Sequence, residues 1–286
     1  MEIVINSKFF AHLSVEQLGE KAIVLGCDGV DICIRPGHPI DADNVVDALP
    51  KAVKIWEKQG VTCPLATAPV TMADANAPEV ENFYTACVAA GIPRLKIGFW
   101  RFKEGDDYWQ VVAEARNALE GFVALSEKHD VQTCYQIHSG ACIGSNCAGL
   151  MHLIRGFPPQ YVGAYTDFGH LALDGEDWAM GLAMIADYLS VVGIKDALYR
   201  PQPEGQKPPY RPSFVKVGEG CVDWHRCLSL LCKMGFDGPL TVHTEYEFDE
   251  SIIRQVGYAA TSPPNVEQWA QEDVAYLRKV LAELSR

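Results

Sequence analysis

The sequence has no excess of basic residues, no long apolar run and no secretory leader pattern. Lysine and arginine number 24 against 37 aspartates and glutamates, so the formal net charge is −13. This balance argues against a nucleic-acid partner and against binding to an anionic membrane. No apolar run reaches the length that spans a bilayer. The first residues, Met1–Val4, lack a basic region followed by a long apolar segment, so no signal peptide is expected.

The ten cysteines include no CxxC pair and no spacing typical of a zinc ribbon. Several of them, such as Cys33, Cys63 and Cys134, lie in apolar runs, where a reduced thiol behaves as a small hydrophobic group. The cysteine pattern therefore indicates a reducing, cytoplasmic compartment. A GxGxxG motif after the first apolar run is also missing, which disfavours a dinucleotide-binding fold.

Strand-like and helix-like segments alternate along the whole chain. The apolar, β-branched runs expected to be strands are 3–6, 29–34, 62–67, 94–99, 131–137, 161–166, 189–195 and 239–245. The segments with helical periodicity are 15–25, 43–59, 77–91, 107–129, 145–155, 175–188, 222–234 and 265–285.

Eight strands that are each followed by a helix predict an α/β protein with a single (β/α)8 TIM barrel over residues 1–286. A doubly wound open sheet is the alternative. The segment 200–213 carries five prolines and follows the seventh strand, so a loop at the barrel mouth is expected there, placed to cover the site.

Polar side chains gather where four successive strands are expected to end. Alternation along a strand puts members of each pair on one face, and the carboxyl ends of barrel strands meet at the mouth where such enzymes keep their chemistry. The pairs are Gln136 with His138, Gly193 with Lys195, and His243 with Glu245, and the end of the sixth strand adds Asp167 and His170. Asp167, Glu245 and one or two of these histidines could hold a divalent cation.

Three further features have a structural and a functional interpretation. Arg35, after the second strand, could bind a phosphate or carboxylate or pair with a rim acid. Trp100 could form an apolar wall for a sugar or pack in the core. The turn 218–220 could bring backbone amides to a ligand, or simply lead into a helix capped by Asp223, which is the favoured interpretation.

The chain resembles the xylose isomerase-like TIM-barrel superfamily, in its sugar phosphate isomerase/epimerase group. The matching pieces recur in the family's order and cover nearly the whole chain. They are Gly29-Val30-Asp31 into Arg35-Pro36-Gly37, Tyr135-Gln136-Ile137-His138-Ser139-Gly140, Asp167-Phe168-Gly169-His170, Lys195-Asp196, Gly218-Glu219-Gly220 and Gly238-Pro239 to Glu245-Tyr246.

The resemblance implies a divalent metal, Mn²⁺, Mg²⁺, Co²⁺ or Zn²⁺, held by Glu, Asp, His and Glu from strands five to eight. Asp167 and Glu245 match this set, whereas Gln136 and Gly193 stand where a glutamate and a histidine are expected. His170 matches a position that contacts substrate hydroxyls. Three arrangements remain open: a metal shifted toward His138, Asp167, His243 and Glu245; metal-free catalysis with His138 or Lys195; or a barrel that only binds sugar.

The expected activity is isomerisation or epimerisation of a sugar or sugar derivative by proton transfer next to a carbonyl group. Catalytic roles are expected for Glu245, His138 and Lys195, and substrate contacts for His170, Gln136, Arg35 and Trp100. A lyase or hydrolase acting on an oxidised sugar and a non-catalytic sugar-binding barrel are the alternatives. A nuclease on this fold would need a basic groove, which the acidic composition disfavours. The acidic surface is compatible with a homodimer.

Overall fold

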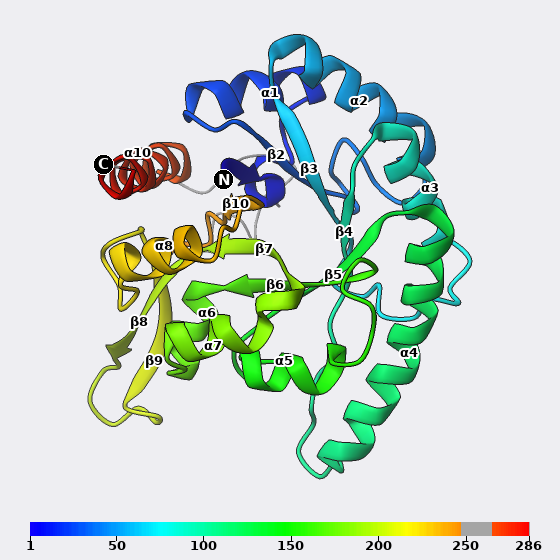
Figure 1. Cartoon of the computed structure of the whole chain (residues 1–286). Helices are drawn as coiled ribbons and strands as arrows, with labels where there is room; N and C mark the ends of the chain where they lie inside the picture. The colour runs from blue at the N-terminus through cyan, green and yellow to red at the C-terminus, as the bar shows by residue number, and fades with distance from the viewer. Residues whose placement is uncertain (247–264, 286) are drawn as a thin grey trace.

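The computed structural model describes residues 1–246 and 265–285, and its main feature is a closed barrel of eight parallel strands surrounded by helices (Figure 1). Around the barrel the strands follow the order β1-β10-β7-β6-β5-β4-β3-β2, and every neighbouring pair is parallel. The predicted (β/α)8 barrel is therefore confirmed. Because all strands run the same way, their carboxyl ends form one mouth.

The barrel strands are short and almost wholly buried. Their bounds are β1 Glu2–Asn6, β2 Gly29–Cys33, β3 Thr62–Thr67, β4 Arg94–Lys96, β5 Gln132–Gln136, β6 Val162–Asp167, β7 Leu189–Ile194 and β10 Pro239–Val242. Outward-facing residues of these strands pack against the apolar stripes of the helices and form the main core. A second, smaller group of Leu65, Cys134, Tyr165 and Val191 fills the inside of the barrel.

The helices begin where the sequence supplies caps. Ser14 and Gln17 form a capping box before α1, and the carboxylates of Asp107 and Asp223 accept backbone N–H groups at the starts of α4 and α8. The helices are η1 Ser7–Phe10, α1 Val15–Val24, α2 Val45–Gln59, α3 Val80–Ala90, α4 Tyr108–His129, α5 Cys147–Ile154, α6 Phe168–Asp174, α7 Trp178–Ile185, η2 Ala186–Tyr188, α8 Trp224–Lys233 and α10 Val266–Leu284.

Two barrel strands end earlier than the sequence pattern predicts. β4 stops at Lys96 because the chain then turns toward the loop after β3, where the Gly98 N–H donates to the Met72 carbonyl at 2.7 Å. β10 stops at Val242, so His243 and Glu245 lie just beyond it, although the His243 N–H still donates to the Ile194 carbonyl of β7. Strand alternation is therefore not a reliable guide to side-chain direction after Lys96.

The proline-rich segment 200–213 is mostly a hairpin and not the predicted loop. It comprises the end of β8 (Asp196–Pro201), a turn, and most of β9 (Tyr210–Val215), and the two strands are antiparallel. Both strands of a two-stranded ribbon are edge strands, which tolerate prolines because a residue there need not donate to a neighbouring strand on both sides. The hairpin projects beside α6 and α8 (Figure 1), and Phe214 near its end reaches the barrel mouth.

The turn 218–220 is held by the buried carboxylate of Asp196. That carboxylate accepts the N–H groups of Gly218 and Val222 at 2.9 and 3.1 Å and the indole N–H of Trp224 at 2.9 Å. Together with the Asp223 cap of α8, these bonds support the structural interpretation of the turn. Among the described residues no helix is long and apolar enough to cross a membrane.

Candidate active site

The Lys195 ammonium lies at the centre of the barrel mouth, directly after β7. Its Nζ is 3.3 Å from Oδ2 of Asp167 and 2.9 Å from Oε2 of Glu245. The same nitrogen is 2.9 Å from Nε2 of His170. Two carboxylates and the His170 ring thus surround the ammonium at the neighbouring strand ends. Lys195 is 4% exposed, so this arrangement is almost free of bulk water.

Asp167 is fixed by the end of β6 and the start of α6. Its Oδ1 accepts the backbone N–H of His170 at 3.2 Å, which caps α6, and its Oδ2 accepts an amide N–H of Gln136 at 2.9 Å. α6 itself was not predicted. The helix starts immediately at Phe168 because the strand-terminal aspartate supplies its cap. Asp167 therefore positions His170 and Lys195 at the same time.

Glu245 is bound by two lysines. Oε1 is 2.6 Å from Nζ of Lys8, and Oε2 faces Lys195. Burial acts to raise the pKa of Glu245, but the positive charges of Lys195 and Lys8 outweigh it and hold the pKa well below its usual value. Burial likewise acts to lower the pKa of Lys195, and the carboxylates of Asp167 and Glu245 reverse this and raise it. Glu245 and Lys195 are therefore both charged at neutral pH.

The three mouth histidines are neutral. Burial, followed by nearby lysines, lowers the pKa of His138, His170 and His243 well below the ordinary value. Nδ1 of His138 lies 2.9 Å from the Gln136 carbonyl oxygen. Since a carbonyl only accepts, Nδ1 carries the proton and Nε2 keeps a lone pair. The His138 ring stacks on Phe99 at 4.3 Å and lies 5.0 Å from His170, between ring centroids.

His243 and His170 are engaged differently. Nε2 of His243 is 2.6 Å from the Tyr165 hydroxyl inside the barrel. Nδ1 of His170 is 2.9 Å from the Ser139 hydroxyl, and its ring lies edge-on to Phe214 at 5.2 Å between centroids. His170 therefore spans the space between the β5 end and the Lys195 ammonium.

The donor set does not fit a divalent cation. Lys195 places a positive charge between the two carboxylates, and Gln136 turns an N–H donor toward Asp167. Gly193 offers no ligand, and a Cβ at that position would lie 2.6 Å from Oδ2 of Asp167. Over residues 1–246 and 265–285, no three His, Cys, Asp or Glu side chains lie together as a metal site requires. The predicted ligand set of Asp167, Glu245, His138 and His243 is thus not gathered around one point.

Most of the predicted site residues do converge on the mouth. Gln136, Asp167, His170, Lys195 and Glu245 form one bonded network, and His138 lies beside it.

Trp100 does not join this network. Its ring stacks on Tyr135 at 5.4 Å between centroids, whereas the neighbouring Phe99 ring stacks on His138.

Lys8, Lys96 and Phe214 also belong to the mouth. Lys8 follows β1 and was not predicted, although its signal is the same as at the other strands: a polar residue after an apolar run. Lys96 is 2% exposed at the end of β4. Phe214, whose ring lies 5.1 Å from Nζ of Lys195, arrives from the hairpin, and no local signal in the sequence places it there.

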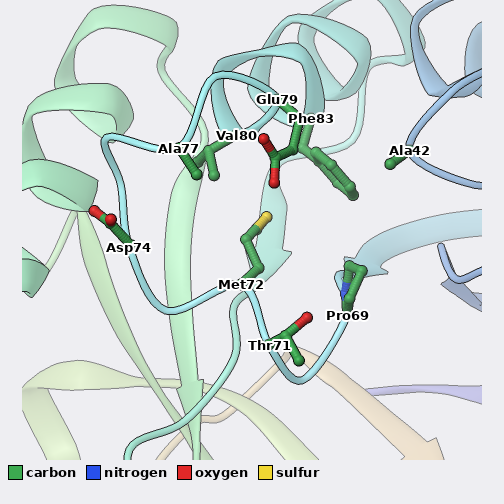
Figure 2. Close-up of a pocket in the computed structure, with 9 residues that line it drawn as sticks. All are labelled: Ala42, Pro69, Thr71, Met72, Asp74, Ala77, Glu79, Val80 and Phe83. Carbon is green, nitrogen blue, oxygen red and sulfur yellow. The ribbon is translucent and has the colours of Figure 1, made fainter.

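A separate hollow lies between the loop after β3 and the start of α3 (Figure 2). Met72 and Phe83 are among its apolar lining residues, and Asp74 and Glu79 supply its only charged side chains among those shown. None of the polar residues of the barrel mouth lines this hollow, so we do not place the active site there.

Comparison with known proteins agrees with this architecture. A solved D-tagatose 3-epimerase-like protein is 14% identical, with a TM-score of 0.74 over 100% of this chain and 98% of its own. The 3-keto-D-glucoside 4-epimerase YcjR from E. coli is 13% identical, with a TM-score of 0.70 over 98% of this chain and 99% of its own.

A xylose isomerase domain protein from Alicyclobacillus acidocaldarius is 14% identical, with a TM-score of 0.74 over 100% of both chains. These identities establish the fold alone. No curated protein sequence matches the chain. The sequence pattern of the xylose isomerase-like TIM barrel matches residues 19–280. The chain therefore belongs to the xylose isomerase-like TIM-barrel family.

Proposed function

We propose that this protein is a sugar isomerase or epimerase that transfers a proton next to a carbonyl group, with the Lys195 ammonium acting as the electrophile. The observation that carries the proposal is the position of Nζ, 2.9 Å from a carboxylate that can act as a base and 3.3 Å from a second one. The sugar epimerases among the solved structures of this fold support a sugar as substrate.

In the proposed step, Glu245 removes a proton from the carbon next to the substrate carbonyl. The electron pair of the C–H bond forms the carbon–carbon double bond of an enediolate, and the carbonyl oxygen becomes an oxyanion. An N–H of Lys195 donates to that oxygen. A positive charge already held in a site almost free of water stabilises such an oxyanion more than water does, because only one N–H has to turn toward the oxygen.

The low pKa of Glu245 in the free protein fits this role when the substrate is bound. Lys195 and Lys8 together suppress the basicity of Glu245. When Lys195 turns an N–H toward the substrate oxygen, it stabilises the negative charge of Glu245 less. The pKa of Glu245 then rises, and the carboxylate becomes a stronger base at the moment of proton transfer. Lys8, on the opposite oxygen, keeps the carboxylate in position.

His138 is the second proton-carrying group of the proposal. Its neutral ring, oriented by the Gln136 carbonyl, leaves Nε2 to accept a proton from a substrate hydroxyl and to return it. Return of the carbon-bound proton from Glu245 to the neighbouring carbon gives an isomer. An epimer forms when His138, carrying the proton it took from a substrate hydroxyl, protonates the same carbon from the opposite face, and Glu245 returns its own proton to that hydroxyl oxygen. His170 and Gln136 are assigned to substrate hydroxyls.

The donor set described above does not suit the divalent metal that the family resemblance implies, so no step is assigned to a metal. The cytoplasmic location and the homodimer remain predictions from the sequence.

The experiment follows exchange of carbon-bound hydrogen with deuterium oxide by NMR, on a panel of ketoses, aldoses and sugar acids. Exchange next to the carbonyl is expected with wild type. A Glu245→Gln variant should be slower by about 10²–10⁴-fold, the contribution of a general base. Undiminished exchange in this variant would refute the proposal. A product with a cleaved bond, or binding without turnover, would favour the lyase, hydrolase or sugar-binding alternatives.

A further inference from the structure

The mouth of the barrel carries two cationic side chains that the proton-transfer network does not use. Asp167 and Glu245 are already matched in charge by Lys195 and Lys8. Lys96 and Arg35 come in addition, on the side formed by β2, β3 and β4. The mouth therefore holds an excess of positive charge inside a protein whose formal net charge is −13.

The backbone register brings these two residues to one level of the barrel. The Ile34 N–H donates to the Thr67 carbonyl and the Ala68 N–H donates to the Lys96 carbonyl, both at 2.9 Å. Arg35 and Lys96 thus stand at the ends of β2 and β4, with only β3 between them (Figure 1). Thr67, which pairs with Lys96 across β3 and β4, turns its hydroxyl into the barrel toward Asp31.

Neither cation forms an ion pair with a carboxylate among the described residues. No hydrogen bond or ion pair joins Nζ of Lys96 to any residue in that part of the chain, although its side chain is 2% exposed. Nε of Arg35 is buried and has no hydrogen-bond partner there. Burying an unpaired charge is costly, and an anionic ligand that paired with both cations would remove that cost.

The Asp31 carboxylate lies near enough for its charge to act on Lys96, but it makes its hydrogen bonds to other groups. Asp31 already accepts from Asn6, Thr67 and Thr241, at 2.7, 2.6 and 2.9 Å. The other neighbour of Lys96 is an aromatic surface, since Nζ lies 5.8 Å from the centre of the Phe99 ring. Burial, followed by the charge of Arg35, lowers the pKa of Lys96 to about 8, so the amine is still mostly protonated at neutral pH.

We propose that Arg35 and Lys96 form an anion-binding subsite, and that the substrate is a sugar carrying a carboxylate or a phosphate group. This inference rests on the proposed function in one respect, that a sugar occupies the same mouth. The guanidinium and the ammonium each donate to oxygens of the anionic group, and the sugar chain then extends from β4 toward Lys195 on β7. Charge-assisted bonds to two cations give the acidic sugar its advantage over a neutral one.

The test is calorimetric binding in the absence of turnover, with the Glu245→Gln variant as the host protein. The probes are D-fructose 6-phosphate and D-galacturonate, each paired with a neutral counterpart, D-fructose and D-galactose. At least one acidic probe should bind about tenfold or more tightly than its counterpart, as charge-assisted hydrogen bonds provide. A preference for the phosphate or for the carboxylate then identifies the anionic group.

Arg35→Gln and Lys96→Met should each remove most of this preference. Arg101→Gln is the control, because Arg101 is an exposed cation that contacts the same Phe99 ring, with its guanidinium carbon 4.9 Å from the ring centre. Arg35 lies in a partly exposed turn, so its variant tests the subsite even if replacement of buried Lys96 disturbs folding.

Two results would overturn the subsite: equal or no binding of acidic and neutral probes, or a preference that survives Arg35→Gln. The experiment measures binding and not turnover, so its result is valid even if the proposed catalytic reaction is wrong.

Discussion

Replacing Lys195 by methionine tests whether its ammonium holds the two site carboxylates together. Methionine keeps the length and apolar stem of lysine and removes the charge. Removing one partner of a buried ion pair costs about 3–5 kcal/mol, because the other charge is left uncompensated. Glu245 retains Lys8 at 2.6 Å, whereas Asp167, which is fully buried, keeps only the Gln136 amide and the His170 backbone N–H.

The expected loss in free energy of unfolding is therefore at the lower end of this range, about 3 kcal/mol. Urea unfolding at pH 7.5 measures it. Lys8→Met is the matched control: the Lys8 side chain is 27% exposed and contacts Glu245 alone among the described carboxylates, so its removal should cost less than about 1 kcal/mol. A second substitution, Asp167→Asn, should restore much of the stability that Lys195→Met loses.

The same variant makes a second, independent prediction about cations. Without the ammonium, Asp167 and Glu245 become two adjacent carboxylates that lack a shared counter-charge, and a divalent cation can replace it. Mn²⁺ should therefore raise the melting temperature of Lys195→Met by more than that of wild type. The reasoning is refuted if the variant unfolds within about 1 kcal/mol of wild type, or if Mn²⁺ stabilises wild type more than the variant.

Three further predictions concern other parts of the chain. Asp196→Ala leaves two backbone N–H groups and the Trp224 indole without their acceptor and should cost about 3 kcal/mol in urea unfolding; a loss below about 1 kcal/mol would contradict this. Burial raises the pKa of Asp273 to about 7, so below that pH the folded state binds a proton that the unfolded state, with its lower carboxyl pKa, does not. Wild type should gain stability over Asp273→Asn by about 1.4 kcal/mol per unit as the pH falls from about 7 to about 5, and a flat difference would argue against this pKa. His138→Gln should slow proton exchange by about 10²-fold or more with little effect on stability, and an unchanged rate would remove His138 from the mechanism.

The barrel was predictable because its signals are repeated and local. Alternating apolar runs and amphipathic segments indicated every barrel strand, and a closed parallel barrel necessarily gathers the strand ends at one mouth. That argument alone is sufficient to bring Asp167, Lys195 and Glu245 together. The same alternation fails after Lys96, where β4 ends early. It pointed to Trp100, whereas Phe99 is the residue whose ring stacks on His138.

The remaining parts of the site depend on contacts between distant segments. Lys8 and Glu245 are separated by 237 residues, and Phe214 reaches Lys195 only because the segment after β7 folds back as a hairpin. The sequence shows that Gln136 and Gly193 replace two expected ligands. It does not show that the Lys195 ammonium lies between the two carboxylates, which only the structure reveals. The predicted metal ligands were inferred from a family pattern from which the chain departs at Gln136 and Gly193.

Exchange of the carbon-bound hydrogen next to a sugar carbonyl, measured by NMR in deuterium oxide with a chelator present, tests the central claim most directly. The account predicts that wild-type exchange keeps its rate in the chelator and does not change when Mn²⁺ is added. It predicts that Lys195→Met lowers this rate by about 10²–10³-fold. Exchange that stops in the chelator and returns with Mn²⁺ would contradict the account, and so would exchange that Lys195→Met leaves unchanged.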